Sequence, residues 1–502
     1  MIINNSKLLA FLNSTPKQVT DIKDDLKILF SFRIFRYFFF ISLLLKILLI
    51  VTFHPKSPST FAPDEGTYAR LAEWVSRGLA VQDFPDFGPN LYNQSRTLIG
   101  PSVLLIKAGI NPLESVRITS LIFGLLFPIL VLLCYVAISK SKKTLHDLNQ
   151  DLNSPSLIFT ILFLFFIPSN FLWSTLGLRE SASQIWIMAQ VYFLIKLYYG
   201  TRMNAPFFGF LALLSSTLSF GSRPQTALVL SIYILIIGFL MFLTKRRLSF
   251  AIFSILSIIL GSAFTTTPEV KIKWQWTVVE KPKLENLENS QESTSIISTI
   301  AKRESSKCDY LGETIKVSEK VLVCRLTKSY EKPLLPEILQ LPNNVDVSTL
   351  EVKRNQNRHD ANSALAPSNC VTEISRVAII GCNLSQIPYR LSAFLLRPFP
   401  IIDRGSFFLS IAGLENIVWA AFLLFSFINF MRLSNLSPVR DIVITIALFI
   451  ILFSSAVSLY EGNLGTAFRH KSTIVGLLVL LNILTVSFRN LKKVKFASSI
   501  RK

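Results

Sequence analysis

About ten apolar runs, each of roughly 17 to 25 residues, are spread along this chain. A helix of that length crosses the ~30 Å hydrocarbon core of a bilayer. Hydrophobic residues make up 51% of the 502 positions and Phe occurs 41 times, a composition too apolar for a water-soluble protein. The sequence therefore predicts an all-α polytopic membrane protein surrounded by a lipid bilayer. The expected spans are 37–53, 115–138, 156–173, 182–199, 204–220, 225–243, 248–264, 409–431, 441–459 and 472–488.

Clusters of Lys and Arg orient these spans. The net charge is +21, and basic residues gather beside span ends at 33–36, 140–143, 245–247, 432–440 and 492–502. If all these clusters are cytoplasmic, they follow the positive-inside rule and both chain ends lie inside. The same distribution accounts for the charge without a nucleic-acid partner, so we expect none.

This orientation divides the chain into five parts. The apolar stretch 98–110 is too short for a span, and counting it as one would place the 140–143 cluster outside. We therefore expect a re-entrant or juxtamembrane helix there. The parts are a cytoplasmic tail at 1–36, spans one to seven at 37–264 with a catalytic outer loop at 54–114, an extracytoplasmic domain at 265–405, spans eight to ten at 406–488 and a cytoplasmic tail at 489–502.

Four of the five cysteines lie in the outer segment 265–405. An even number of cysteines in an extracytoplasmic segment predicts disulfide bonds, which an oxidising compartment preserves. Three pairings exist; loop closure favours the two local ones, and four free thiols are the alternative. The favoured pairs are Cys308 with Cys324 and Cys370 with Cys382. Near the end of the segment, 387–396 has the pattern of a helix lying in the membrane interface.

The first outer loop carries the strongest chemical signal. From Pro63 onward, apolar side chains recur at helical spacing, which predicts a helix whose apolar face rests on the membrane surface. Asp64 and Glu65 stand at its start. Asp64 fits a helix N-cap, a role that Asp prefers. It also fits a catalytic carboxylate, paired with Glu65, that accepts a proton from a nucleophile or holds a divalent metal.

Two motifs in this region are typical of one enzyme superfamily. They are PDEGTYARLAEW at 63–74 and ESVRITSLIFGLL at 114–126, with the short apolar helix between them. This arrangement resembles the GT-C superfamily of membrane glycosyltransferases, which use polyprenyl-phosphate sugars and include protein O-mannosyltransferases and the aminoarabinose transferase of lipid A. The likeness is clearest over 37–139 and fades to general architecture by residue 264.

The resemblance implies roles for particular residues. Asp64 would be the catalytic base or a metal ligand, with Glu65 its neighbour, and Mg or Mn would be the candidate cofactor. One departure concerns the donor phosphate. The superfamily often has a basic residue followed by Pro-Pro at the re-entrant helix, whereas this chain has Ile99, Gly100, Pro101 and Ser102. The resemblance therefore does not identify the residue that holds the phosphate.

Basic side chains near the outer span ends are candidates for that role. The planar fork of Arg pairs well with phosphate oxygens. Each of these residues also fits an ordinary snorkelling anchor. They are Arg96, Arg117, Arg179, Arg223, Arg469 and His470. The last two belong to EGNLGTAFRHK at 461–471, which together with LLRPFPII at 395–402 and GLENIVW at 413–419 resembles membrane proteins of the O-antigen polymerase kind.

The function expected from these features is sugar transfer from a polyprenyl-phosphate carrier to an acceptor glycan, lipid or protein. The location would be a bacterial inner membrane, with the active site facing the periplasm. Two alternatives stay open: a polymerase that joins lipid-linked repeat units, and a flippase that needs no catalytic carboxylate. Zinc catalysis and nucleotide-driven transport are not expected, because the chain has four His with no HExxH motif and no Walker or Rossmann glycine pattern.

Overall fold

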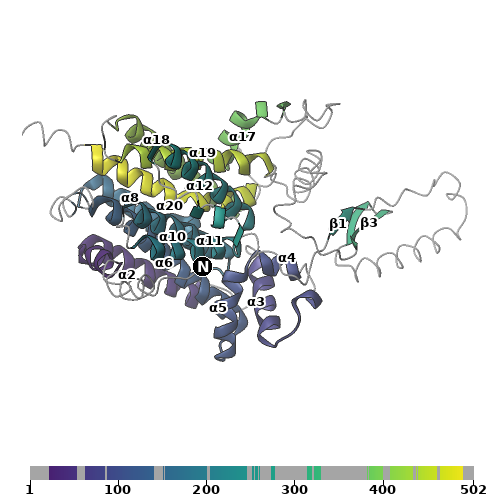
Figure 1. The fold of residues 1–502 in the computed structure, drawn as a ribbon. Coiled ribbons are helices and arrows are strands. Elements are labelled where there is room, and N and C mark those ends of the chain that lie inside the picture. Colours follow the sequence, from purple (N-terminus) through teal and green to yellow (C-terminus); the bar gives the residue numbers. More distant parts are fainter. Residues whose placement is uncertain are drawn as a thin grey trace, which may run out of the picture.

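Long helices lie side by side in one bundle, with shorter helices gathered at one corner (Figure 1). The structure is a computed structural model. It describes residues 22–53, 63–84, 88–140, 153–199, 204–245, 273–276, 314–318, 321–328, 384–399, 407–433, 439–460 and 464–489, with short pieces at 148, 151, 252–253, 255–257, 259–260, 381–382 and 437.

Helices dominate these residues. In chain order they are α2 (Arg33–Leu48), η1 (Leu49–Phe53), α3 (Pro63–Ser76), η2 (Val81–Asp83), α4 (Gly88–Asn93), α5 (Arg96–Lys107), α6 (Pro112–Lys140), α8 (Pro155–Phe166), α9 (Pro168–Trp173), α10 (Arg179–Tyr199), α11 (Ala205–Phe220), α12 (Pro224–Lys245), α17 (Ile387–Leu396), α18 (Phe407–Met431), α19 (Arg440–Tyr460) and α20 (Leu464–Arg489).

Within the described residues, five helices are long and apolar enough to cross a membrane, which makes the chain a multi-pass membrane protein. They are Arg33–Thr52, Pro112–Lys140, Ala412–Met431, Arg440–Leu459 and Ala467–Phe488. The ten-span topology stays a prediction. One of its spans, 156–173, is not a single helix: it is split into α8 and α9, because Pro168 disfavours helical backbone at Ile167, whose ψ is 122°.

The helix α20 forms the centre of the bundle. It packs against α6, α8, α10, α18 and α19, and 94% of its span is buried. The peripheral helix α2 has only 17% of its span buried. Helix α10 packs extensively against both α6 and α11. These contacts bring the N-terminal ends of α6, α10 and α20, which are distant in sequence, into one region of the molecule.

A lysine in the first span has a structural explanation in α6. Pro128 lies inside that helix and lacks a backbone N–H, so the carbonyl of Gly124, four residues earlier, loses its helical partner. Buried Lys46 of α2 donates to this carbonyl oxygen at 3.3 Å, and its ammonium also lies 5.4 Å from the centre of the Phe171 ring. Lys46 therefore satisfies a polar group that would otherwise be costly inside a membrane helix.

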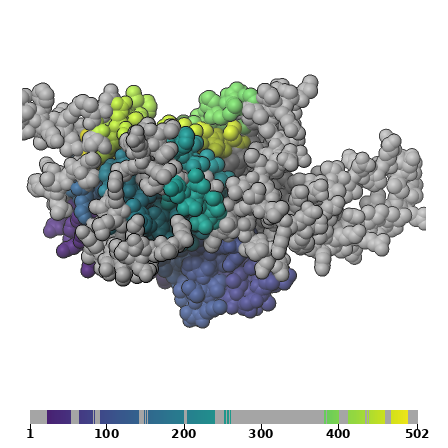
Figure 2. Space-filling model, viewed as in Figure 1, coloured from purple at the N-terminus to yellow at the C-terminus, as the bar shows by residue number. Residues whose placement is uncertain are grey.

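Helices α3 and α5 form the lobe at the bottom of Figure 2. Two residues after the end of α3 and of α5 stands a glycine with positive φ, Gly78 at 74° and Gly109 at 92°, a conformation that suits glycine just past a helix C-terminus. The apolar face of α3 packs on α5 and α6. The prediction that this face rests on the membrane surface is therefore wrong: a protein core covers it. The stretch expected at 98–110 as a short outer helix corresponds to α5.

Three short stretches of the segment 265–405 form strands, which the all-α prediction did not include. Three antiparallel strands, β1 (Lys273–Trp276), β2 (Thr314–Ser318) and β3 (Val321–Lys328), pair in the order β1-β3-β2. Lys273 pairs with Lys328, and Thr314 pairs with Cys324. Cys382 is disulfide-bonded. Its partner, and the placement of the Cys308 and Cys370 side chains, lie outside the described residues, so the two predicted pairs stay a prediction.

Candidate functional site

Four predicted site residues meet at the N-terminal ends of helices from distant parts of the chain. Asp64 stands in the first turn of α3, Arg179 begins α10, Arg223 precedes α12, and Arg469 lies in the second turn of α20. Arg469 donates from Nη1 to Asp64 Oδ2 at 2.6 Å, a contact between residues 405 positions apart. Helices α3 and α20 are therefore joined through this ion pair.

A second ion pair lies beside the first and is almost completely buried. Arg223 Nη2 donates to Glu180 Oε1, and both side chains are less than 8% exposed. Glu180 also lies within the electrostatic reach of Arg179 and Arg469. We call Asp64, Arg179, Glu180, Arg223 and Arg469 the charge cluster. Its three guanidinium groups face two carboxylates, which leaves an excess of one positive charge.

The helix ends add to this positive potential. The N-terminus of a helix carries a partial positive charge, and α3, α10, α12 and α20 all direct that end toward the charge cluster. A buried excess of positive charge with exposed access at Asp64, whose side chain is 51% exposed, is suited to binding an anion from solvent or from the membrane surface.

A tightly packed loop positions Arg179 and Glu180. Ser120 of α6 donates from Oγ toward the carbonyl oxygens of Trp173 and Leu178, at 3.1 and 3.3 Å. A Cβ added at Gly177 would lie 2.5 Å from Cγ2 of Val116, so only glycine allows the loop to approach α6 this closely. The loop between α9 and α10 is therefore held against α6, and the start of α10 has a fixed position.

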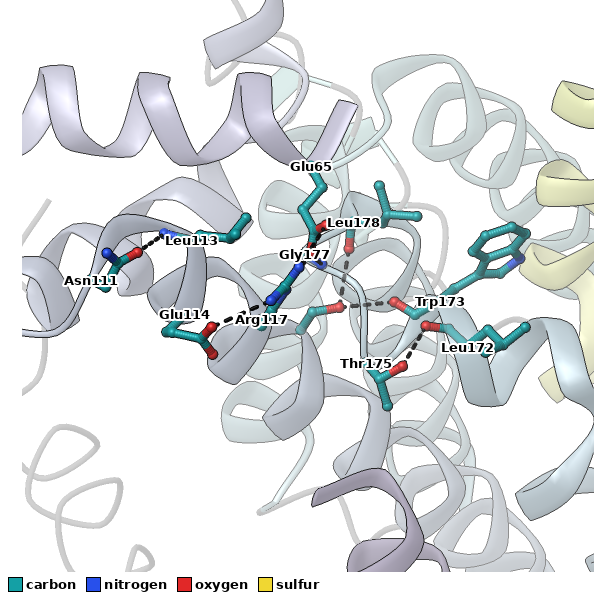
Figure 3. Close-up of polar contacts among 11 residues, drawn as sticks. Glu65, Asn111, Leu113, Glu114, Arg117, Leu172, Trp173, Thr175, Gly177 and Leu178 are labelled. Atoms are coloured by element: carbon teal, nitrogen blue, oxygen red, sulfur yellow. Dashed lines mark hydrogen bonds and ion pairs between the residues drawn. The ribbon is translucent and has the colours of Figure 1, made fainter. Parts of the chain in front are cut away.

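Glu65 and Arg117 lie outside the charge cluster and form a separate buried ion pair (Figure 3). Arg117 donates from Nε to Glu65 Oε1 at 2.6 Å and from Nη2 to Oε2 at 3.2 Å. The backbone N–H of Gly177 donates to the same Oε1 at 3.1 Å, and Arg117 also reaches Glu114 at 3.3 Å. Both members of the pair are at most 1% exposed. The pair ties α3, α6 and the α9–α10 loop together.

Arg96 occupies a position at the edge of the site. It donates from Nη2 to Asn93 Oδ1 at 2.5 Å, and its guanidinium lies 5.3 Å from the Tyr92 ring centre. Burial lowers the pKa of Arg96 from its usual value. Its neighbour Gln94 accepts from Arg179 Nη1 at 2.9 Å. The α4–α5 turn therefore supports Arg179 through Gln94, while Arg96 itself is held within its own turn.

The basic residues after Arg469 have other surroundings. His470 is buried, at 9% exposure. Buried Lys471 donates to Asn416 Oδ1 of α18 at 2.8 Å and to the carbonyl of Arg397 after α17. Lys471 thus connects α20 with α18 and with the end of α17. Within residues 468–471, the contact with Asp64 that the structure shows is that of Arg469.

Three residues that are not among the predicted site residues belong to this site. Glu180 neutralises part of its positive charge, and the Arg469 guanidinium lies 5.7 Å from the Trp173 ring centre. Tyr68 of α3 is 3% exposed and lies within the electrostatic reach of all five charged groups. A signal for Tyr68 existed, because it follows Asp64 by four residues and therefore shares its helix face.

The donor set around Asp64 does not favour a resident divalent metal. Its nearest described carboxylate neighbour in the cluster is Glu180, and each of the two is already paired with an Arg. Three guanidinium groups would repel a divalent cation. Among the residues that the structure describes, no group of three or more His, Cys, Asp and Glu side chains converges. We therefore route no chemistry through a metal.

Comparison with known proteins places the chain in no family: no family model and no curated protein sequence matches it. The resemblance to GT-C enzymes accordingly depends on the motifs in 63–74 and 114–126 and stays a hypothesis.

Proposed function

We propose that the chain is a membrane glycosyltransferase that moves a sugar from a polyprenyl-phosphate carrier to an acceptor hydroxyl at the outer face of the membrane. The observation that carries this proposal is the convergence of Arg179, Arg223 and Arg469, from three distant parts of the chain, onto a single carboxylate-containing site. A lipid-linked phosphate reaches such a site from the membrane, and the excess positive charge matches an anion.

In the proposed reaction the acceptor oxygen attacks the anomeric carbon of the sugar while the bond from that carbon to the phosphate oxygen breaks. Negative charge develops on the leaving phosphate, and preorganised guanidinium groups stabilise it without reorganisation at the moment of reaction. Asp64 accepts the proton of the acceptor hydroxyl. Its half-exposed carboxylate is accessible to that acceptor, whereas Glu180 is buried in its ion pair.

The ion pair of Asp64 with Arg469 fits this sequence of events. Arg469 is 21% exposed, so a phosphate entering the site competes with Asp64 for the same guanidinium. Phosphate binding would then release Asp64 to act as the proton acceptor. Glu65 and Arg117 take no direct part, because they bind each other and are buried.

A glycan profile of the cell envelope from a strain lacking this chain tests the proposal. Loss of one terminal sugar supports the transferase. Loss of long chains with short units retained indicates a polymerase, and intact units that accumulate on the cytoplasmic face indicate a flippase. Complementation with Asp64→Asn should fail, while Asp83→Asn, which changes an exposed carboxylate of the same outer loop, should restore the profile. Full restoration by Asp64→Asn would refute its catalytic role.

A further inference from the structure

Tyr68 combines a packed ring with a hydroxyl that faces charge. Its ring belongs to the apolar core formed by α3, α5, α6 and the α9–α10 loop, and only 3% of the residue is exposed. Its charged neighbours are Arg179, Glu180, Asp64 and Arg223. The ring packing explains why an aromatic residue stands here, but Phe would pack equally well. The hydroxyl therefore needs a separate explanation.

Among the described residues, no hydrogen bond is shown for that hydroxyl, and its oxygen is not one of the fully enclosed polar atoms that lack a partner. A largely buried hydroxyl without a protein partner is available to a ligand, because polar groups in protein interiors are nearly always hydrogen-bonded. Burial raises the pKa of Tyr68 to about 12, so the group is protonated at physiological pH. A protonated phenol among guanidinium groups can donate one hydrogen bond, and a bound anion would accept it.

We propose that Tyr68 donates a hydrogen bond to the lipid phosphate that Arg179, Arg223 and Arg469 bind. This inference rests on the proposed function, because it takes the phosphate of the carrier as the anion. A neutral donor contributes a contact without adding to the positive charge of the site. The burial of Tyr68 favours the phosphate over the acceptor as its partner, since the acceptor must approach the more exposed Asp64.

Binding measurements on the purified full-length protein in detergent test this assignment. The probes are a short-chain polyprenyl phosphate and the corresponding polyprenol, which lacks the phosphate. Tyr68→Phe should bind the phosphate about 10- to 100-fold more weakly than the wild type, the range expected for losing a hydrogen bond to a charged group. Binding of the polyprenol should not change, because the ring and its packing remain.

Tyr92→Phe is the matched control, because Tyr92 lies in the same outer loop, contacts the Arg96 guanidinium through its ring and is not among the electrostatic neighbours of the charge cluster. It should bind both probes like the wild type. Equal weakening of both probes by Tyr68→Phe would indicate a packing defect and overturn the assignment, as would phosphate binding within about 2-fold of the wild type. If the wild-type protein binds the phosphate no more tightly than the polyprenol, both the proposed function and the role of Tyr68 are refuted. If the wild type prefers the phosphate but Tyr68→Phe binds it equally well, only the role of Tyr68 is refuted.

Discussion

Neutralising Asp64 should affect activity, whereas neutralising the adjacent Glu65 should affect stability. Asp64 and Glu65 differ by one position, yet Asp64 is 51% exposed and Glu65 is fully buried. We predict that Glu65→Gln destabilises the fold, whereas Asp64→Asn leaves stability nearly unchanged and removes activity. Neither change alters side-chain size by much, so the comparison isolates charge.

The expected magnitudes follow from burial. Removing one partner of a buried ion pair costs about 3–5 kcal/mol, because the other charge is left without compensation. Arg117 keeps a 3.3 Å contact with half-exposed Glu114, so we expect a value near the lower end, about 3 kcal/mol. An ion pair as exposed as that of Asp64 and Arg469 contributes only ~0–1 kcal/mol.

Denaturant-induced unfolding of the purified variants in mixed micelles measures the difference. A double variant, Glu65→Leu with Arg117→Met, serves as a control, since replacing a whole buried ion pair with apolar residues of similar volume is often neutral or stabilising. It should recover most of the stability lost in Glu65→Gln. If Glu65→Gln unfolds at the same denaturant concentration as Asp64→Asn, the structural role assigned to the buried pair is refuted.

Three further predictions concern the site and its supports. Arg469→Gln should lower kcat/KM by about 100-fold, the usual effect of removing one donor to a developing negative charge, while Arg77→Gln on the surface of the same lobe should match the wild type in a sugar-transfer assay. Gly177→Ala should shift the loop that carries the start of α10 and cost about 1–3 kcal/mol in unfolding free energy; unchanged stability would show that the loop yields easily. Lys46→Met should lower the unfolding free energy by about 1–3 kcal/mol in the wild type. The loss should be much smaller in a Pro128→Ala background, because residue 128 then has a backbone N–H that can bind the Gly124 carbonyl. Equal losses in both backgrounds, measured as a double-mutant cycle, would contradict the link between Lys46 and Pro128.

Local patterns in the sequence were sufficient to predict several helices. The helix from Pro63 follows from apolar spacing, and Ile387–Leu396 has the bounds expected from its pattern. The break at Pro168 was also visible in the sequence, but the apolar composition of 156–173 outweighed it. Hydropathy averages over a window and therefore does not detect where a single proline ends a helix.

The candidate site was predictable only in part. Arg179, Arg223 and Arg469 were expected at one level of the membrane, and the structure brings them together around Glu180. The pairing of Glu65 with a residue 52 positions away was not predictable, because no local pattern records a tertiary contact. A carboxylate beside Asp64 suggested shared chemistry, whereas the two side chains project to different faces of α3.

The same limitation applies to lysines inside the apolar runs. Lys46 has no local explanation in its own span, and its role depends on a proline in α6 that leaves a carbonyl without a helical partner. Lys471 follows Arg469 by only two positions, yet its side chain binds Asn416 of α18. Polar residues in spans acquire their roles from neighbouring helices, which the sequence of a single span does not contain.

Sugar transfer by the purified protein in liposomes tests the central claim most directly. With a radiolabelled polyprenyl-phosphate sugar and an acceptor extract from the same cells, the wild type should transfer label and release polyprenyl phosphate. Asp64→Asn should reduce that turnover by roughly 100-fold or more, because it loses the proton acceptor. Asp83→Asn should keep full activity. Near-normal transfer by Asp64→Asn, or no transfer by a folded wild-type protein, would contradict the assignment of this site as a glycosyltransferase centre.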